Sequence, residues 1–317
     1  MVEGDKELKA NKDAGRRATL VLVSKYPTPG SSKTRLIPAL GEALAAQLAM
    51  AMLQDLLQRF SIEDPAGEFR KVFVYAPPSA GPSVNKMLKD MGLDKTWDAE
   101  PVSSGTPLRE SGLTTILEAA LASARSRERD GAVIFVGMDT PELPWSEVVA
   151  ARSSAEKDGK AYICPASDGG YTLLGLPPKA GRGTFEGVKW SDSLTCKSQT
   201  RALASRGVST RTGGTYHDVD EADDVAGLEK RSPRGLEGVS LCTTVAVRQG
   251  ETDEDRHDTA IETEGWTDRP TENKKCVGEE ELCRQDGCHV LHGTRMRAHL
   301  QHARNTLGNT SMWSVFR

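Results

Sequence analysis

Short apolar runs alternate with longer amphipathic stretches up to about residue 230 of the chain. The apolar runs predict buried strands at 18–23, 71–76, 132–136, 161–164, 171–176 and 208–212. Apolar residues at helical spacing predict helices at about 38–60, 83–91, 113–124, 144–157, 193–206 and 221–230. This alternation predicts an α/β fold in which a mostly parallel central sheet carries helices on both faces.

Composition divides the chain into three parts. We expect residues 1–17 to be a polar tail and residues 18–231 to form the α/β domain. Polar and charged residues dominate 232–317 without a sustained helical or strand period, so we expect a poorly structured C-terminal extension. The hydrophobic share of 37% agrees with a chain that is not packed throughout.

Charge and cysteine content argue against several classes of protein. A net charge of −4 over 317 residues gives no reason to expect a nucleic-acid partner. No apolar run approaches the roughly 20 residues of a membrane span, and the charged N-terminal segment lacks the apolar centre of a secretory signal. Six cysteines in a chain of this length do not make a disulfide scaffold. Together these features predict a cytoplasmic protein with reduced thiols and no membrane partner.

The stretch 24–36 follows the first predicted strand and carries the first candidate chemistry. Two prolines and Gly30 predict a rigid turn, after which Lys33 and Arg35 stand beside hydroxyl groups such as that of Thr34. A turn at the carboxyl end of a strand that presents cations and donors is where an open α/β sheet binds anionic ligands. The stretch therefore predicts a phosphate site.

Three acidic or glycine-rich motifs also follow predicted strands. They are Gly137-Met138-Asp139, Asp168-Gly169-Gly170 and Asp218-Val219-Asp220. Because the carboxyl ends of parallel strands share one edge of a sheet, we expect the three motifs to converge on the cationic stretch. Carboxylates beside a phosphate group predict a site for Mg²⁺ or Mn²⁺, which take oxygen ligands.

Each of these motifs also has a simpler interpretation. Asp139 could cap the helix that follows it. Asp218 and Asp220 could interact favourably with the positive N-terminal end of the last helix dipole. Asp-Gly-Gly is a common turn sequence, and the cations of the stretch 24–36 could be solvated surface charges. The expected convergence carries more weight than any single motif.

Five ordered motifs resemble those of a bacterial group of GT-A-fold transferases. These "transferase 1" proteins are associated with radical-SAM and selenium-domain proteins, and some are linked to arsenosugar biosynthesis. The motifs are KYPTPGSSKTRL (25–36), VGMDTPELP (136–144), PASDGGYTLLGL (165–176), FEGVKWS (185–191) and DVDEADD (218–224). The chain is similar, more distantly, to phospholactate guanylyltransferase and molybdenum-cofactor guanylyltransferase. It departs from those enzymes because it lacks a Gly-Gly-x-x-x-Arg opening, and only Leu108-Arg109-Glu110 vaguely matches an acidic-Arg segment.

The resemblance implies a role for each motif residue. It implies that Lys33 and Arg35 contact phosphates, and that Asp139 is the main metal ligand, completed by Asp218 or Asp220. It makes Lys33, Arg35 and Asp139 the catalytic set. The residues implied in substrate binding are Lys25, Gly30, Thr34, Asp168, Gly169, Gly170 and Tyr171, of which the last four would line the acceptor or nucleobase side.

The implied activity is that of a metal-dependent transferase with a nucleotide-diphosphate donor, and glycosyl transfer from a nucleotide-sugar to a small-molecule acceptor is favoured. The family link favours glycosyl transfer, whereas the Lys-Thr-Arg stretch, similar to that of phospholactate guanylyltransferase, favours nucleotidyl transfer with release of pyrophosphate. A nucleotide-binding regulatory module without turnover is a further alternative. The absence of an obvious nucleophile suits a reaction that depends on positioning and charge stabilisation.

The other candidate residues either match a functional motif poorly or are explained equally well by a structural role. Cysteine and histidine side chains gather in the C-terminal extension without the Cys-x₂-Cys pair typical of zinc sites, at Cys276, Cys283, Cys288, His289 and His292. We expect Cys164 to be a small buried residue, and Cys196 has no adjacent base. His217 beside Asp218 could act as a general base or be structural, and Trp190 could pack or stack on a ligand.

Overall fold

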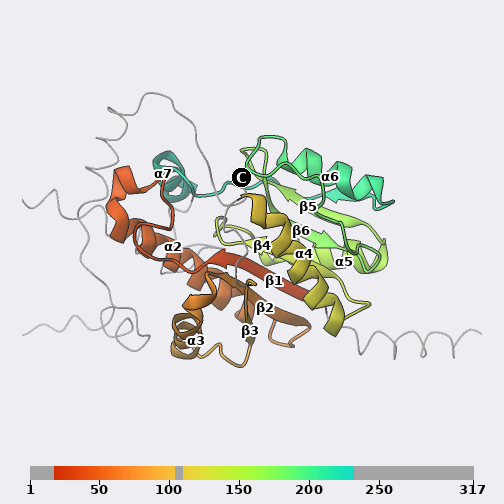
Figure 1. Ribbon diagram of the computed structural model, residues 1–317, viewed down its shortest axis with the longest axis horizontal. Helices are drawn as coiled ribbons and strands as arrows, with labels where there is room; N and C mark the ends of the chain where they lie inside the picture. The colour runs from red at the N-terminus through yellow and green to blue at the C-terminus, as the bar shows by residue number, and fades with distance from the viewer. Residues whose placement is uncertain (1–17, 104–109, 232–317) are drawn as a thin grey trace, which may run out of the picture.

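The computed structural model describes residues 18–103 and 110–231 (Figure 1). The predicted tail, the C-terminal extension with its cysteines and histidines, and the residues Leu108 and Arg109 lie outside the described residues. In chain order the described elements are β1 (Ala18–Lys25), α2 (Ile37–Ile62), β2 (Phe69–Ala76), η1 (Pro78–Ala80), α3 (Gly81–Asp90), β3 (Trp97–Pro101), α4 (Glu110–Arg127), β4 (Val133–Gly137), α5 (Trp145–Lys157), β5 (Ala161–Pro165), β6 (Tyr171–Leu176), α6 (Thr195–Ser205), β7 (Thr210–Thr212) and α7 (Ala222–Arg231).

One sheet of seven strands organises the described residues, in the order β3-β2-β1-β4-β6-β5-β7. Strand β6 runs antiparallel to both of its neighbours, β4 and β5, and every other pair in the sheet is parallel. Val21 in the central strand β1 lies between Val72 of β2 and Phe135 of β4, so a continuous apolar strand is buried on both faces. The predicted mostly parallel sheet is confirmed.

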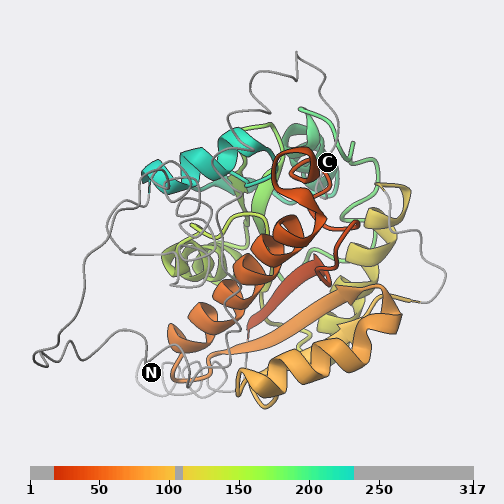
Figure 2. The ribbon, with the colours of Figure 1, turned by 90° about the vertical axis from the view of Figure 1, so that its left-hand side faces the viewer.

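Helices cover both faces of the sheet, as predicted (Figures 1 and 2). Apolar side chains of α2, α3 and α5 pack with Leu20 and Leu22 of β1 in one core cluster. Side chains of α4 and α6 pack with Val21 of β1 in the cluster on the other face. Alternate residues of β1 therefore enter opposite cores, which is the two-residue period of a strand.

Helix α2 joins the sheet to the last helix. Figure 2 shows α2 running along the sheet beside β1. Its N-terminal part packs on Val225 and Leu228 of α7 in a third core cluster. The backbone breaks at Gly41, whose φ of 77° is outside helical geometry, so the continuous helix predicted from residue 38 is wrong at this point.

Helix α2 is also long and apolar enough by length and composition to cross a membrane, unlike the expectation from the sequence. Half of its most apolar window is buried within the structure. Leu53, Leu57 and Phe60 are fully buried against the sheet. This burial explains the composition, because a helix between two packed surfaces is apolar on most of its circumference.

The edge strand β3 was not predicted. Its sequence Trp-Asp-Ala-Glu-Pro is polar, and only Trp97 is buried, with its indole N–H donating to Leu57 O and Ser61 Oγ. A strand at the edge of a sheet has one neighbour and needs few apolar residues, so the hydrophobic pattern does not reveal it.

Candidate functional site

A small pocket opens where the predicted motifs meet at the carboxyl ends of β4 and β5. The described residues that line it are Gly137, Asp139, Thr140, Ala166, Asp168, Gly170, Tyr171, Thr172 and Asp218. Three aspartates from three segments therefore face one pocket. The expected convergence of the acidic motifs is present in the structure.

Backbone hydrogen bonds hold the acidic segments together. The amide of Val219 donates to Asp139 O over 2.8 Å, which joins the segment before α7 to the end of β4. The amide of Tyr216 donates to Pro165 O over 3.0 Å, and Ser167 N donates back to Tyr216 O over 3.0 Å. The ends of β4 and β5 thus contribute to holding the segment that carries Asp218 and Asp220.

Lys33 lies at the centre of the charged groups. Its Nζ donates to Asp139 Oδ1 and, over 2.9 Å, to Asp220 Oδ1, and its side chain is only 3% exposed. Burial alone would lower the pKa of Lys33, but attraction by Asp139 and Asp220 outweighs it and holds the pKa above its usual value. The ammonium group is therefore a permanent cation between two carboxylates.

One ammonium group does not compensate the carboxylates around it. Burial raises the pKa of Asp139; Lys33 opposes this rise, and the charge of Asp220 adds to it. Burial, with repulsion from Asp220, Asp168 and Asp139, raises the pKa of Asp218 to about 7. The carboxylates at this site thus repel one another, and a bound cation would relieve that repulsion.

The cationic stretch is built as a tight turn. Thr28 N donates to Ser32 Oγ over 2.9 Å, and Gly30 and Lys33 have φ values of 77° and 47°. A φ of 47° is rare for a lysine, and the side chain of this residue is buried. Thr34 is exposed beside it.

The two predicted phosphate ligands have different surroundings. Arg35 Nη1 lies 3.4 Å from Oε1 of Glu221, just before α7. Lys25, at the end of β1, lowers the pKa of Asp139 by its charge and so lies near the pocket. The phosphate contacts of Lys33 and Arg35 stay predictions.

The Asp168-Gly169-Gly170 turn connects β5 to β6. Asp168 Oδ1 accepts the amide of Gly170 over 2.8 Å, and both residues line the pocket. Gly169 has a φ of 95°, and a Cβ there would lie 2.1 Å from Ser193 O. The glycine is therefore required for contact with the segment before α6, and it does not itself line the pocket.

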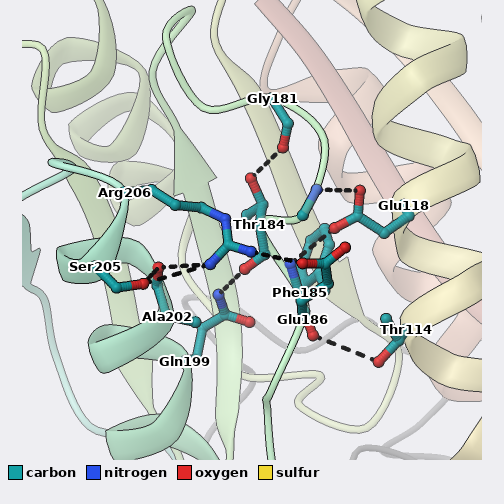
Figure 3. A network of polar contacts seen from close by, with 11 residues as sticks. Thr114, Glu118, Gly181, Thr184, Phe185, Glu186, Gln199, Ala202, Ser205 and Arg206 are labelled. Atoms are coloured by element: carbon teal, nitrogen blue, oxygen red, sulfur yellow. Dashed lines mark hydrogen bonds and ion pairs between the residues drawn. The ribbon is translucent and has the colours of Figure 1, made fainter.

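Tyr171 connects the pocket wall to a hydrogen-bonded loop that leads into the FEGVKWS motif at Phe185. Its hydroxyl donates to Gln199 Oε1 over 3.2 Å, and the Gln199 amide donates to Thr184 O over 2.9 Å. Figure 3 shows Glu118 of α4 on the other side of this loop, where it accepts the amides of Gly183 and Phe185. No local pattern marks Glu118, because its partners lie more than sixty residues away.

The remaining candidates have mainly structural surroundings. Cys164 is fully buried, as expected. The indole N–H of Trp190 donates to Thr114 Oγ1 over 2.8 Å, and its ring packs on Tyr171 with centroids 6.3 Å apart. His217 is exposed beside the pocket segment.

The donor set fits Mg²⁺ or Mn²⁺ by its chemistry, since its members are carboxylates and their charges are undercompensated. Within 18–103 and 110–231, however, no three His, Cys, Asp or Glu side chains already form a metal-ligand group. Lys33 Nζ holds the position between Asp139 and Asp220 that two ligands of one cation would share. Metal binding by these aspartates stays a prediction.

Comparison with known proteins agrees with the fold. A crystal structure of a "putative nucleotide-diphospho-sugar transferase" from Desulfovibrio desulfuricans G20 matches with a TM-score of 0.63 and 22% sequence identity, over 74% of this chain and 94% of that chain. The chain has a nucleotide-diphospho-sugar transferase fold. The predicted fold class is confirmed, whereas an identity of 22% carries no conclusion about activity.

Other matches are partial. The family described as "Uncharacterized protein conserved in bacteria (DUF2064)" matches residues 86–192, which include Asp139 and the Asp168 turn but neither Lys33 nor Asp218. A structure of a "putative glucose-1-phosphate thymidylyltransferase" from Bacillus anthracis, in complex with a sucrose, matches at a TM-score of 0.42 and 9% identity, over 70% of this chain and 97% of that chain. A CMP:2-keto-3-deoxy-manno-octonic acid synthetase complexed with CTP matches at 0.35 and 12%, over 69% and 100%. No curated protein matches the chain.

Proposed function

We propose that this protein is a metal-dependent transferase that uses a nucleotide-diphosphate donor, with glycosyl transfer from a nucleotide-sugar as its reaction. The observation that carries the proposal is the pocket at the carboxyl edge of the sheet, where Asp139, Asp168 and Asp218 meet beside Lys33. Open α/β sheets bind ligands at this edge. An excess of carboxylates beside lysines suits a metal–diphosphate ligand better than it suits either ion alone.

Each group has a distinct part in this proposal. Asp139, with Asp218 or Asp220, would hold the Mg²⁺ or Mn²⁺, which supplies charge neutralisation for a diphosphate leaving group. Lys33 balances Asp139 and Asp220 without ligand and would turn its ammonium group to a phosphate oxygen when a donor binds. Arg35 would approach the phosphates with its planar fork of donors, which a lysine cannot offer.

The pocket wall would hold the acceptor or the base. Asp168 and Gly170 present a carboxylate and backbone groups, and the buried ring of Tyr171 gives an apolar surface next to them. Backbone approach is possible at Gly170 because a glycine has no side chain. Gly169 contributes by holding this turn against the segment before α6.

A second candidate function is nucleotidyl transfer, which the Lys33-Thr34-Arg35 stretch favours by its similarity to that of phospholactate guanylyltransferase. The two reactions differ in their products. Glycosyl transfer releases a nucleoside diphosphate, whereas nucleotidyl transfer from a triphosphate releases pyrophosphate. A regulatory module would bind a nucleotide and release neither.

Calorimetric titration tests the proposal directly. UDP-, GDP- and ADP-sugars and nucleoside triphosphates are titrated with and without Mn²⁺, and the released products are identified by mass spectrometry. We expect at least one nucleotide ligand to bind the wild type only when metal is present. We expect Asp139→Asn to lose this metal-dependent binding. Asp98→Asn is the matched control. Asp98 is a surface partner of Arg70 and belongs to none of the five motifs. Equal binding by wild type and Asp139→Asn would refute the metal site.

A further inference from the structure

The carboxylate-bearing segment before α7 has no regular secondary structure between Thr212 and Ala222. A segment of this length is held in place only if its backbone and side chains find fixed partners. Its amide at Val219 bonds to Asp139 O, near the acidic end of the segment. The other end of the segment is held by a residue that lies outside the pocket.

That residue is Glu147, in the first turn of α5. Its Oε1 accepts the amide of Gly214 over 3.0 Å and the hydroxyl of Tyr216 over 2.8 Å. Its Oε2 accepts the hydroxyl of Tyr162 over 2.6 Å and the thiol of Cys164 over 3.4 Å, both in β5. One carboxylate therefore binds the sheet and the irregular segment at the same time.

The fit around this carboxylate is close. A Cβ at Gly213 would lie 2.7 Å from Glu147 Oε2 and 2.6 Å from the Tyr162 ring. A Cβ at Gly214 would lie 2.9 Å from Glu147 Oε1 and 2.8 Å from the Tyr216 hydroxyl. The two adjacent glycines thus let the backbone approach a carboxylate that any side chain at these positions would push away.

The charge of Glu147 is maintained by its donors. Burial alone would raise the pKa of Glu147, but hydrogen bonds from Tyr162, Tyr216 and Gly214 outweigh it and lower the pKa. A charged acceptor binds hydroxyl and amide donors more strongly than a neutral amide would. The contact therefore depends on a carboxylate and not only on shape.

We propose that Glu147 is a positioning residue that fixes the segment from Gly213 to Asp220 so that Asp218 faces the pocket and Asp220 faces Lys33. The connection is short, because Tyr216, which Glu147 binds, is two residues before Asp218. Tyr216 also exchanges backbone hydrogen bonds with Pro165 and Ser167 on either side of the β5 end. The role in metal binding rests on the proposed function, whereas the role in fixing the segment does not.

Two variants separate this role from a general contribution to α5. Glu147→Gln keeps the size of the side chain and removes its charge. Tyr216→Phe removes one donor and leaves the charge at the start of α5. Glu156→Gln on the same helix is the matched control, since Glu156 pairs with Arg152 and accepts Ala132 N at the other end of α5.

Hydrogen exchange measured by mass spectrometry is the first readout and needs no metal. We expect Glu147→Gln and Tyr216→Phe to speed exchange in peptides that cover 213–221 at least tenfold, with α5 and β5 unchanged. We expect Glu156→Gln to leave that segment unchanged. Unchanged exchange at 213–221 in both variants, or equal loss throughout α5, would overturn the proposal.

Mn²⁺ affinity measured by electron paramagnetic resonance is the second readout. Residues that orient metal ligands typically change affinity 10- to 100-fold when they are replaced, and we expect a loss of about tenfold in both variants. No Mn²⁺ binding by the wild type would refute the proposed function but leave the exchange result to decide the positioning role. Wild-type affinity in a Glu147→Gln protein with faster exchange would show that the segment is fixed for another purpose and overturn the metal part.

Discussion

At the scale of single residues, two of the described lysines, Lys33 and Lys71, are buried in ion pairs that differ in one respect. Lys33 forms ion pairs with the two carboxylates of Asp139 and Asp220, whereas Lys71 forms its ion pair with Asp64. Both lysine side chains are 3% exposed, and so is that of Asp64. The pair at Lys71 has the geometry of a structural ion pair, and it is the natural reference for Lys33.

Replacing each lysine by methionine distinguishes the two sites. Breaking a buried ion pair by removing one partner costs about 3–5 kcal/mol, so both Lys33→Met and Lys71→Met should lower the melting temperature in chelator. Only Lys33→Met leaves two facing carboxylates that a divalent cation can bridge. Differential scanning fluorimetry should therefore show that Mn²⁺ restores Lys33→Met by more than it stabilises the wild type. Lys71→Met should show no such recovery, and recovery of neither variant would contradict the cation site.

Asp218 should make the protein less stable as the pH rises. Its pKa is about 7 in the folded chain against an ordinary value of 3.8, so between these values the folded chain binds the extra proton. The free energy of unfolding then falls by about 2–4 kcal/mol as the pH rises through this window, and it levels off above pH 7. Asp218→Asn should remove this slope and melt at a higher temperature than the wild type at pH 8 in chelator. An Asp218→Asn protein that retains the wild-type pH profile would contradict this assignment.

Residue-level contacts were only partly predictable. The approach of Lys33, Asp139, Asp218 and Asp220 follows from strands that end at one edge of a sheet, and the sequence contains that information. The left-handed backbone at Lys33 was not predictable, because no sequence pattern indicates it at a residue that is not glycine. Glu147 was not singled out, because its partners lie in two segments that are distant from it in sequence, β5 and the stretch before α7.

At the scale of elements, boundaries and types were predictable where a strand is buried on both faces. The strand at Tyr171–Leu176 was predicted with its observed bounds, but the sequence did not indicate its antiparallel direction. Direction depends on how the chain turns at the preceding Asp168-Gly169-Gly170 motif. The edge strand Trp97–Pro101 was missed because its single buried tryptophan makes no period.

The turn at Gly169 gives an element-level prediction with an internal control. Gly159 and Gly169 both have positive φ values, 63° and 95°, but nothing lies within 4 Å of a Cβ at Gly159. Gly159→Ala should therefore cost only the backbone strain of about 1–2 kcal/mol. Gly169→Ala adds an overlap with Ser193 O and should cost more than about 3 kcal/mol in urea unfolding. Equal costs would show that the contact between this turn and the segment before α6 yields easily.

At the scale of the whole molecule, the described residues build a core on each face of one sheet. The two large core clusters lie on opposite faces, and the third joins α2 to α7. Val225 and Leu228 of α7 cover Leu40, Leu48 and Met52 of α2. The predicted domain from residue 18 to residue 231 therefore includes α7 as part of its core.

Two fragments test this boundary. A fragment of residues 18–231 should melt within about 2 °C of the full chain and bind Mn²⁺ and nucleotide with the same affinity, because its core is complete. A fragment of residues 18–221 keeps the pocket aspartates but loses α7. It exposes the apolar N-terminal part of α2 and loses the burial of Val225 and Leu228, each worth about 1.5–3 kcal/mol. Circular dichroism should show a lower melting temperature only for the shorter fragment. A large loss of stability or affinity already at 18–231 would mean that residues beyond Arg231 contribute to the domain or its site.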